Sequence, residues 1–259
     1  MNERQHDLHR LALLSETDLT NPNQVRASAL KMEQLFLREG VSTQGVNLDN
    51  ELVHRLQQLY ERFETDLEYD FADRINSGKT STEKGYPLYG RFLRLTQAES
   101  DLASIRPSDK ILFIGSGPFP ISAILLSKLN SANVDCYDKS TDACIISQRV
   151  VDKLGLSDRI TVSNSSGEDG KVYGYNVIIV ALLAQPKDRI MDNMWFHAPG
   201  NVRIICRNSE GDRRFFYKGV SPQSLTAYKH FALVDEHRAQ ADNTISSLFV
   251  KVDREPDKH

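Results

Sequence analysis

Two glycines and an aspartate, at the ends of two predicted strands, are the residues whose types and spacing point most directly to chemistry. Gly115, Ser116 and Gly117 follow the apolar stretch 110–114 and open a predicted helix. Glycines at such a turn let the backbone approach a ligand, and the helix start offers free N–H groups. Asp138 ends the next predicted strand about twenty residues later, where a carboxylate can accept hydrogen bonds from both ribose hydroxyls. Together these residues favour an adenosyl ligand.

The turn lacks the third glycine of the dinucleotide-binding pattern. Gly117 is followed by Pro118, Phe119 and Pro120, so a ring stands where close helix packing on a pyrophosphate requires no side chain. A dinucleotide is therefore disfavoured. The glycines alone are also compatible with a tight structural turn that binds nothing, and it is Asp138 that favours a nucleoside.

Two more predicted strands end near this turn. Ser165 and Ser166 follow the third strand, and Ala181 and Leu182 end the fourth. Because the carboxyl ends of parallel strands meet at one edge of a sheet, where ligands bind, we expect these residues to surround the adenosyl group.

The first hundred residues have the periodicity of helices, whereas the remainder alternates short β-branched stretches with helices. Helices are predicted over residues 22–38, 50–75, 89–103, 121–130, 141–154, 186–196 and 222–228. Strands are predicted over residues 110–114, 134–137, 159–163, 175–181, 201–206, 230–238 and 244–252, the last two forming a hairpin.

This order predicts an α/β fold in two domains. Residues 1–104 are expected to form an all-α N-terminal domain, and residues 105–259 a Rossmann-like domain. A parallel sheet that closes with an antiparallel C-terminal β-hairpin resembles the class I S-adenosylmethionine methyltransferase architecture more than a dehydrogenase.

Composition excludes several classes of protein. The 259 residues are 40% hydrophobic and 26% charged, which indicates a globular chain with a core, not disorder. A net charge of −3 disfavours nucleic acid and anionic membranes as main partners. With no long apolar segment, no signal peptide and three isolated cysteines expected as core residues, we expect a cytoplasmic protein. A homodimer is compatible with the sequence, but no feature requires one.

Four blocks, in order and at matching spacing, resemble the nicotianamine synthases and their bacterial opine-metallophore relatives. The blocks are KILFIGSGPFPIS, DCYDKS, YNVIIVALLA and RNSEGDRRFFYKGVSP, within a resemblance that covers roughly residues 84–250. In this family a strand ends in G-S-G-P-x-P, an acidic residue follows in Y-D, and a late loop reads R-x-x-x-G before an aromatic–Tyr pair.

The resemblance also implies roles for individual residues. The segment YPLYGRFLRLTQAESDL makes Tyr89 and Glu99 the counterparts of the family's active-site tyrosine and catalytic glutamate. Tyr217 is a second hydroxyl that could relay a proton or orient the amine. Arg207 and Arg214 are candidates to clamp a carboxylate through the bidentate guanidinium fork, although Arg214 fits an ordinary loop charge equally well.

Two departures from the plant enzymes affect these implications. Ser166 stands where they carry an acidic residue, which alters the expected adenine contact, and Glu210 stands where they have His before the loop glycine. The second difference is consistent with a different acceptor.

The reaction implied by the resemblance transfers the 3-amino-3-carboxypropyl group of S-adenosylmethionine, as co-substrate, to an amine, and releases methylthioadenosine. In the bacterial relatives the acceptor is thought to be histidine, and a downstream opine dehydrogenase is the implied partner. An α-amino group has a pKa of about 8, so a base is needed. Glu99 suits this role if burial raises its pKa. The implied reaction also gives residues 1–104 a role, as a lid that covers the sheet edge and completes the acceptor pocket, which is compatible with a packing or dimerisation module. The histidines lack ligand spacing, so we expect no metal in the enzyme itself.

Two other functions share part of this pattern. An ordinary S-adenosylmethionine methyltransferase would use Gly115, Gly117 and Asp138 but would produce S-adenosylhomocysteine. A non-catalytic adenosyl-nucleotide sensor would bind the nucleotide without forming either by-product and would not need Glu99.

Overall fold

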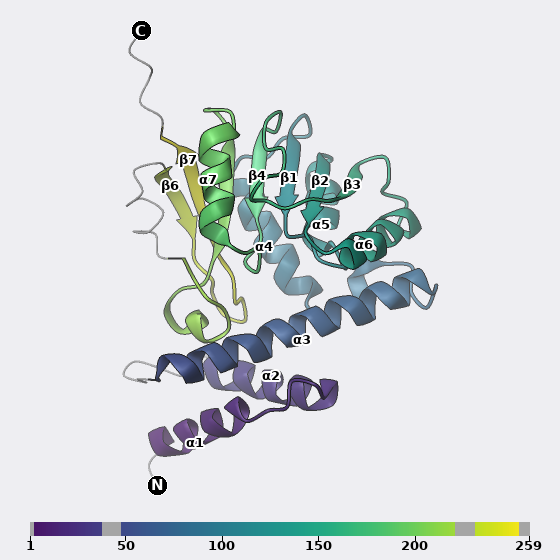
Figure 1. The fold of residues 1–259 in the computed structure, drawn as a ribbon. Helices are drawn as coiled ribbons and strands as arrows, with labels where there is room; N and C mark the ends of the chain where they lie inside the picture. Colours follow the sequence, from purple (N-terminus) through teal and green to yellow (C-terminus); the bar gives the residue numbers. More distant parts are fainter. Residues whose placement is uncertain (1–2, 38–47, 221–230, 254–259) are drawn as a thin grey trace.

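The computed structural model describes residues 3–37, 48–220 and 231–253, and Figure 1 shows their arrangement. Seven strands form a single sheet in the order β3-β2-β1-β4-β5-β7-β6. They are β1 (Lys110–Ile114), β2 (Asn133–Asp138), β3 (Ile160–Asn164), β4 (Val177–Val180), β5 (Arg203–Asn208), β6 (Phe231–His237) and β7 (Ser246–Val252). The first five pair in parallel, and β7 runs antiparallel to both β5 and β6. The predicted parallel sheet with a closing hairpin is confirmed.

Helices connect the parallel strands and cover both faces of the sheet. The connecting helices are α5 (Ile121–Asn130), α6 (Thr141–Lys153) and α7 (Lys187–His197). The order in which the strands lie requires the crossover through α7 to cover the opposite face from those through α5 and α6. Figure 1 shows α7 in front of the sheet and α4 (Tyr89–Leu102) behind it, where α4 packs against α5. Among the described helices, none combines the length and hydropathy that crossing a membrane requires.

The long helix α3 (Asn50–Asn76) runs across one end of the sheet, as Figure 1 shows. Its apolar stripe includes Leu56, Leu59, Phe63 and Phe71, all buried. The helices α1 (Glu3–Ser15) and α2 (Pro22–Phe36) pack on α3 away from the sheet. The predicted start of α2 is confirmed, because the side chain of Asn21 caps it and Pro22 is its first residue.

Predicted and observed elements differ mainly where strand pairing decides the boundary. The strand predicted over 201–206 is β5, which continues to Asn208 because Asn208 pairs with Ser246 of β7. The strand predicted over 175–181 is shorter, Val177–Val180. Two 3₁₀ turns, η1 (Glu83–Gly85) and η2 (Gly211–Phe215), lie in predicted loops. The helix predicted over 222–228 lies outside the described residues.

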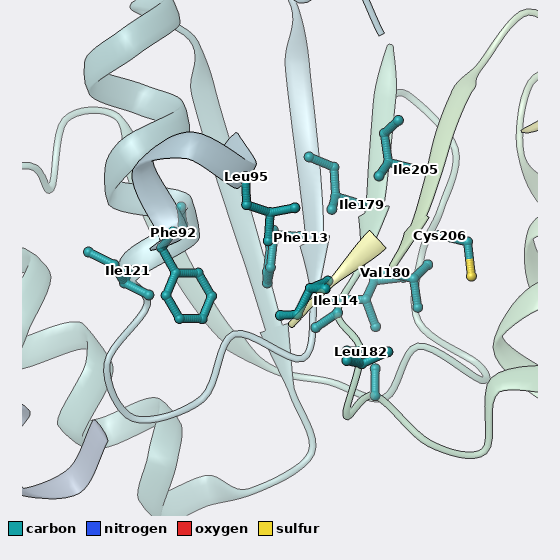
Figure 2. Close-up of a cluster of buried hydrophobic side chains, with 14 of the residues drawn as sticks. Phe92, Leu95, Phe113, Ile114, Ile121, Ile179, Val180, Leu182, Ile205 and Cys206 are labelled. Atoms are coloured by element: carbon teal, nitrogen blue, oxygen red, sulfur yellow. The ribbon is translucent and has the colours of Figure 1, made fainter. Parts of the chain in front are cut away.

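One continuous hydrophobic core joins the helical region to the sheet. Figure 2 shows Phe92 and Leu95 of α4 beside Phe113 of β1. The three cysteines are free and buried, as expected for core residues. The predicted boundary between residues 104 and 105 falls in the loop between α4 and β1, and the division into two domains stays a prediction.

Arg203 holds the end of α4 to the sheet. Its guanidinium donates to the carbonyls of Ala103 at 2.8 Å and Ser104 at 2.7 Å, and to the carboxylate of Asp109 at 2.6 Å. Asp109 is buried, so removing its partner leaves a poorly solvated charge.

We expect Arg203→Met to lower the free energy of unfolding by about 2–4 kcal/mol, because it strands a buried carboxylate and two carbonyls. Urea denaturation measures this. The matched control is Arg159→Met, since Arg159 meets Asp158 only at the exposed surface, and its effect should stay within about 0.5 kcal/mol. Equal effects of the two variants would contradict the structural role given to Arg203.

Candidate active site

A cavity of about 360 Å³ lies between α3 and the carboxyl ends of the parallel strands. This volume is in the range of small-molecule sites. From α3 it is lined by Glu61, Glu64, Thr65, Glu68 and Tyr69. From the sheet side the predicted cofactor-binding residues all line it, namely Gly115, Ser116, Gly117, Pro118, Asp138, Ser165, Ser166, Ala181 and Leu182. The structure therefore brings these nine residues together at one edge of the sheet.

The turn after β1 needs its glycines for two different reasons. Gly115 and Gly117 have φ values of 85° and 67°, in the left-handed region that other residues rarely adopt. A Cβ on Gly115 would lie 3.0 Å from the Cβ of Ala184, so this glycine permits close packing. A Cβ on Gly117 would lie 2.3 Å from Oε2 of Glu68, so the bare face of Gly117 is covered by a carboxylate of α3.

The Asp138 carboxylate is oriented by backbone donors on both of its oxygens. The N–H of Gly117 donates to Oδ2 at 2.8 Å and that of Ser140 to Oδ1 at 2.9 Å. Each oxygen keeps further acceptor capacity toward the cavity. The Ser116 hydroxyl is buried next to the Cys136 thiol, whose pKa it lowers against the larger effect of burial. The site thus presents a carboxylate of fixed orientation to a polar ligand.

Glu99 and Arg207 form a buried ion pair. The guanidinium donates from Nε to Oε1 and from Nη2 to Oε2, both at 2.9 Å, and the Ser247 hydroxyl donates to Oε1 at 2.7 Å. The guanidinium also lies against the rings of Phe92 and Phe113. Arg207 lines the cavity, but Glu99 is fully buried behind it. Glu99 therefore orients Arg207 at the cavity wall, and its catalytic role stays a prediction. A carboxylate of α3 lies on the cavity wall itself and is a second candidate for the base.

That carboxylate is Glu64, which sequence reasoning missed. Burial raises the pKa of Glu64 to about 7, despite the lowering influence of Tyr217 and Arg91. The Tyr217 hydroxyl is fully buried beside it and is the strongest influence that lowers the pKa of Glu64. Glu64 also borders a smaller recess lined by Asn243 and Thr244. The available signal was a glutamate within the apolar stripe of the predicted helix 50–75.

Two predicted site residues do not line the cavity. Tyr89 is half-buried at the start of α4 and packs against the core. Arg214 is exposed, and its guanidinium lies over the Phe215 ring. Tyr86, which was not predicted as a site residue, is buried near Glu68. Burial raises the pKa of Tyr86, and the charge of Glu68 raises it further.

A buried lysine supports the sheet side of the cavity. Lys187 donates to the carbonyls of Ala181 at 2.7 Å, Leu182 at 3.0 Å and Arg207 at 3.4 Å. Burial lowers the pKa of Lys187, but three carbonyl acceptors match the three donors of the ammonium form. Lys187 thereby joins the ends of β4 and β5.

Comparison with known proteins decides the family. The family model described as "Nicotianamine synthase protein" matches residues 40–253. The chain belongs to the nicotianamine synthase family. This confirms the resemblance found in the four sequence blocks.

Relatives in the nicotianamine synthase family are distant in sequence. Nicotianamine synthase 9 of Hordeum vulgare is 25% identical over 178 residues, which cover 64% of this chain and 52% of that protein. The chain thus spans about half the length of the curated relatives it matches.

Solved structures show the same fold. MtNAS in complex with MTA and tNA superposes with a TM-score of 0.86 and 21% identity, covering 98% of this chain and 100% of that one. The mitomycin 7-O-methyltransferase MmcR has a TM-score of 0.56 and 11% identity, covering 94% of this chain and 75% of that one. The predicted class I methyltransferase-type sheet is confirmed.

Substitution of Gly117 tests whether α3 is held against the glycine turn. Gly117→Ala and Gly155→Ala both place Ala at a φ of 67°, but only Gly155 faces open space. Each should lose about 1 kcal/mol or somewhat more to backbone strain. We expect Gly117→Ala to lose more stability because its Cβ collides with Glu68. We also expect it to weaken adenosyl-ligand binding at least tenfold, because relieving this collision shifts the turn whose N–H orients Asp138. Urea denaturation and calorimetric titration with methylthioadenosine measure both effects, and similar results for the two variants would contradict this arrangement.

Proposed function

We propose that this chain transfers the 3-amino-3-carboxypropyl group of S-adenosylmethionine to the α-amino group of an amino acid and releases methylthioadenosine. The observation that carries the proposal is Glu64, a buried carboxylate with a pKa of about 7 that faces the nucleoside-binding turn across one cavity. Family membership supports the same reaction. MtNAS has been crystallised with MTA, and a glutamate-to-glutamine variant of it with S-adenosylmethionine.

The sheet side of the cavity would bind the adenosine portion. Asp138 would accept hydrogen bonds from the ribose hydroxyls, since its carboxylate is already oriented by two backbone donors. The adenine would lie between the loop of Ser165 and Ser166 and the end of β4 at Ala181 and Leu182, all on the cavity wall.

Arg207 would hold the carboxylate of the methionine arm. Its Nε and Nη2 donate to Glu99, which leaves N–H donors of Nη1 for a carboxylate in the cavity. On this assignment Glu99 is a positioning residue for Arg207 and not the base. Tyr89 and Arg214 lie off the cavity wall, and direct roles for them stay predictions.

The bond changes follow from this placement. The acceptor amine attacks the γ-carbon of the methionine arm, the N–C bond forms, and the C–S bond breaks with its electron pair remaining on sulfur. The proton lost by the amine passes to Glu64, whose raised pKa suits a base near neutral pH. Tyr217 beside Glu64 would orient the carboxylate or the amine.

The finer parts of the proposal rest on the resemblance to the bacterial opine-metallophore enzymes. They are histidine as the acceptor, a downstream opine dehydrogenase as the partner that consumes the product, and a cytoplasmic location. The balanced composition supports a small-molecule acceptor over a nucleic acid. Any metal would be bound by the final product.

Glu64→Gln should reduce turnover by about 100- to 10,000-fold with little change in S-adenosylmethionine binding, because it removes the base and keeps the shape. Mass spectrometry of reactions with both histidine enantiomers and other amino acids measures methylthioadenosine and an acceptor about 101 daltons heavier. Glu51→Gln is the matched control, since Glu51 is exposed on the same helix and does not line the cavity.

The same assay separates the alternative functions. S-adenosylhomocysteine as the by-product would identify a methyltransferase. Binding of S-adenosylmethionine with neither by-product, across the whole acceptor panel, would identify a sensor. Undiminished turnover of Glu64→Gln would contradict its assignment as the base.

The pH dependence of turnover tests the pairing of Glu64 with Tyr217. A base acts only when ionised, so kcat should rise with pH through about 7, the pKa of Glu64. Tyr217 lowers the pKa of Glu64, and Tyr217→Phe should therefore move this rise to higher pH, by roughly 0.5–1 unit for a contact of about 1 kcal/mol. A shift to lower pH, or none, would contradict the pairing.

A further inference from the structure

Glu68 is a half-buried carboxyl group on the cavity wall that the proposed reaction does not use. It lies one helical turn after Glu64 on α3, and both line the cavity. Among the described residues it has no hydrogen-bond or ion-pair partner. A carboxylate kept on a cavity wall without a partner is suited to a charged ligand.

The position of Glu68 is fixed by its contact with the glycine turn. Its Oε2 lies over the bare face of Gly117, and the N–H of Gly117 donates to Asp138. The charges of both Glu64 and Asp138 act on Glu68. Glu64, one helical turn earlier, also borders the recess lined by Asn243 and Thr244. Along the cavity the order is therefore Asp138, Glu68, Glu64.

This order matches the reacting atoms. Asp138 is assigned to the ribose and Glu64 to the attacking amine, and in S-adenosylmethionine the sulfur lies between the ribose and the carbon under attack. Four residues of helix advance about 6 Å. A C–S bond plus a near-attack contact of about 3–3.5 Å spans a similar distance. On these assignments Glu68 lies beside the expected position of the sulfonium.

The charge balance of the cavity supports the same conclusion. Glu64, Glu68 and Asp138 line it, whereas the buried cation Arg207 is already paired with Glu99. Exposed Lys139 is near the edge of the cavity. Burial raises the pKa of Glu68 well above its usual value, and the negative charges of Glu64 and Asp138 raise it further, whereas the positive charge of Arg207 lowers it. An arriving cation would relieve this repulsion.

We propose that Glu68 is the counter-charge to the donor's sulfonium, so that the site binds the cationic donor tightly and its neutral thioether product weakly. This rests on the proposed function. When the C–S bond breaks, sulfur keeps the electron pair and loses its positive charge. The attraction to Glu68 therefore disappears in the same step, which favours release of methylthioadenosine.

Binding measurements without acceptor test this directly. S-adenosylmethionine and S-adenosylhomocysteine differ by a methyl group and one positive charge, and methylthioadenosine lacks the arm. Isothermal titration calorimetry of the full chain should show S-adenosylmethionine binding at least tenfold tighter than S-adenosylhomocysteine. In Glu68→Gln the S-adenosylmethionine Kd should rise about tenfold or more, while the other two Kd values change less than about threefold.

The controls separate charge from fold. Glu51→Gln removes an exposed carboxylate from the same helix, paired with Arg55 and outside the cavity lining, and should change no Kd by more than about threefold. Glu68→Asp keeps the charge one methylene away and should retain part of the preference. Thermal unfolding shows whether each variant is folded.

Proton release gives a second readout that a structural role would not change. Titratable groups around Glu68 are Glu64 on its own helix, Asp138, Arg207 and Tyr86. Binding of S-adenosylmethionine should release protons from this cluster, measured in buffers of different ionisation enthalpy. Glu68→Gln should release fewer, and S-adenosylhomocysteine should release fewer from the unsubstituted chain.

The outcomes are distinct. An equal loss for S-adenosylmethionine and S-adenosylhomocysteine would assign Glu68 to the α-ammonium group and overturn the proposal, as would unchanged Kd values. Absence of binding by all three ligands would refute the proposed function itself. Charge-dependent binding without methylthioadenosine formation would refute the transfer reaction and leave the role of Glu68 standing.

Discussion

The buried ion pair of Glu99 with Arg207 joins the helical region to the sheet where the cavity begins. Removing two charges from water is unfavourable unless both find full hydrogen bonding, so this pair tolerates few arrangements of α4 against β5. Ser247 of β7 supplies the remaining donor, and the rings of Phe92 and Phe113 border the guanidinium. Helix α4 and strands β1, β5 and β7 must therefore assemble together. The edge of the Arg207 guanidinium that Glu99 does not occupy faces the cavity.

With α4 fixed in this way, the carboxyl edge of the sheet is left for α3 to cover. Its apolar stripe buries against the core, and the same face carries Glu64 and Glu68 into a confined space. Their raised pKa values follow from that burial. On an exposed helix the same two glutamates would have the ordinary pKa values of glutamate side chains. The chemistry of the site thus depends on the packing of a helix whose sequence looks like plain amphipathic structure.

The dependence of the site on packing explains which parts of the fold and of the site could be predicted from the sequence. Local signals predicted the strands, the glycine turn and Asp138, because strand ends and positive φ angles favour particular residue types that can be recognised in the sequence. They could not predict the partner of Glu99, because Arg207 is distant in the chain and the pairing exists only in the folded sheet. Glu64 was missed for the opposite reason, since a glutamate inside an apolar stripe looks like a solvated charge until the facing surface is known.

The sheet shared with methyltransferases does not by itself determine which group leaves the sulfonium. All three carbons on sulfur are electrophilic, so the product depends on which one faces the nucleophile at close range. On the proposed function, Asp138 holds the ribose at one end of the cavity and Arg207 holds the arm carboxylate at the sheet wall. The γ-carbon then lies between two fixed points and faces α3, where Glu64 lies. On that proposal, transfer of the arm instead of the methyl group would follow from a helix placed across the sheet edge and an arginine held by one buried glutamate.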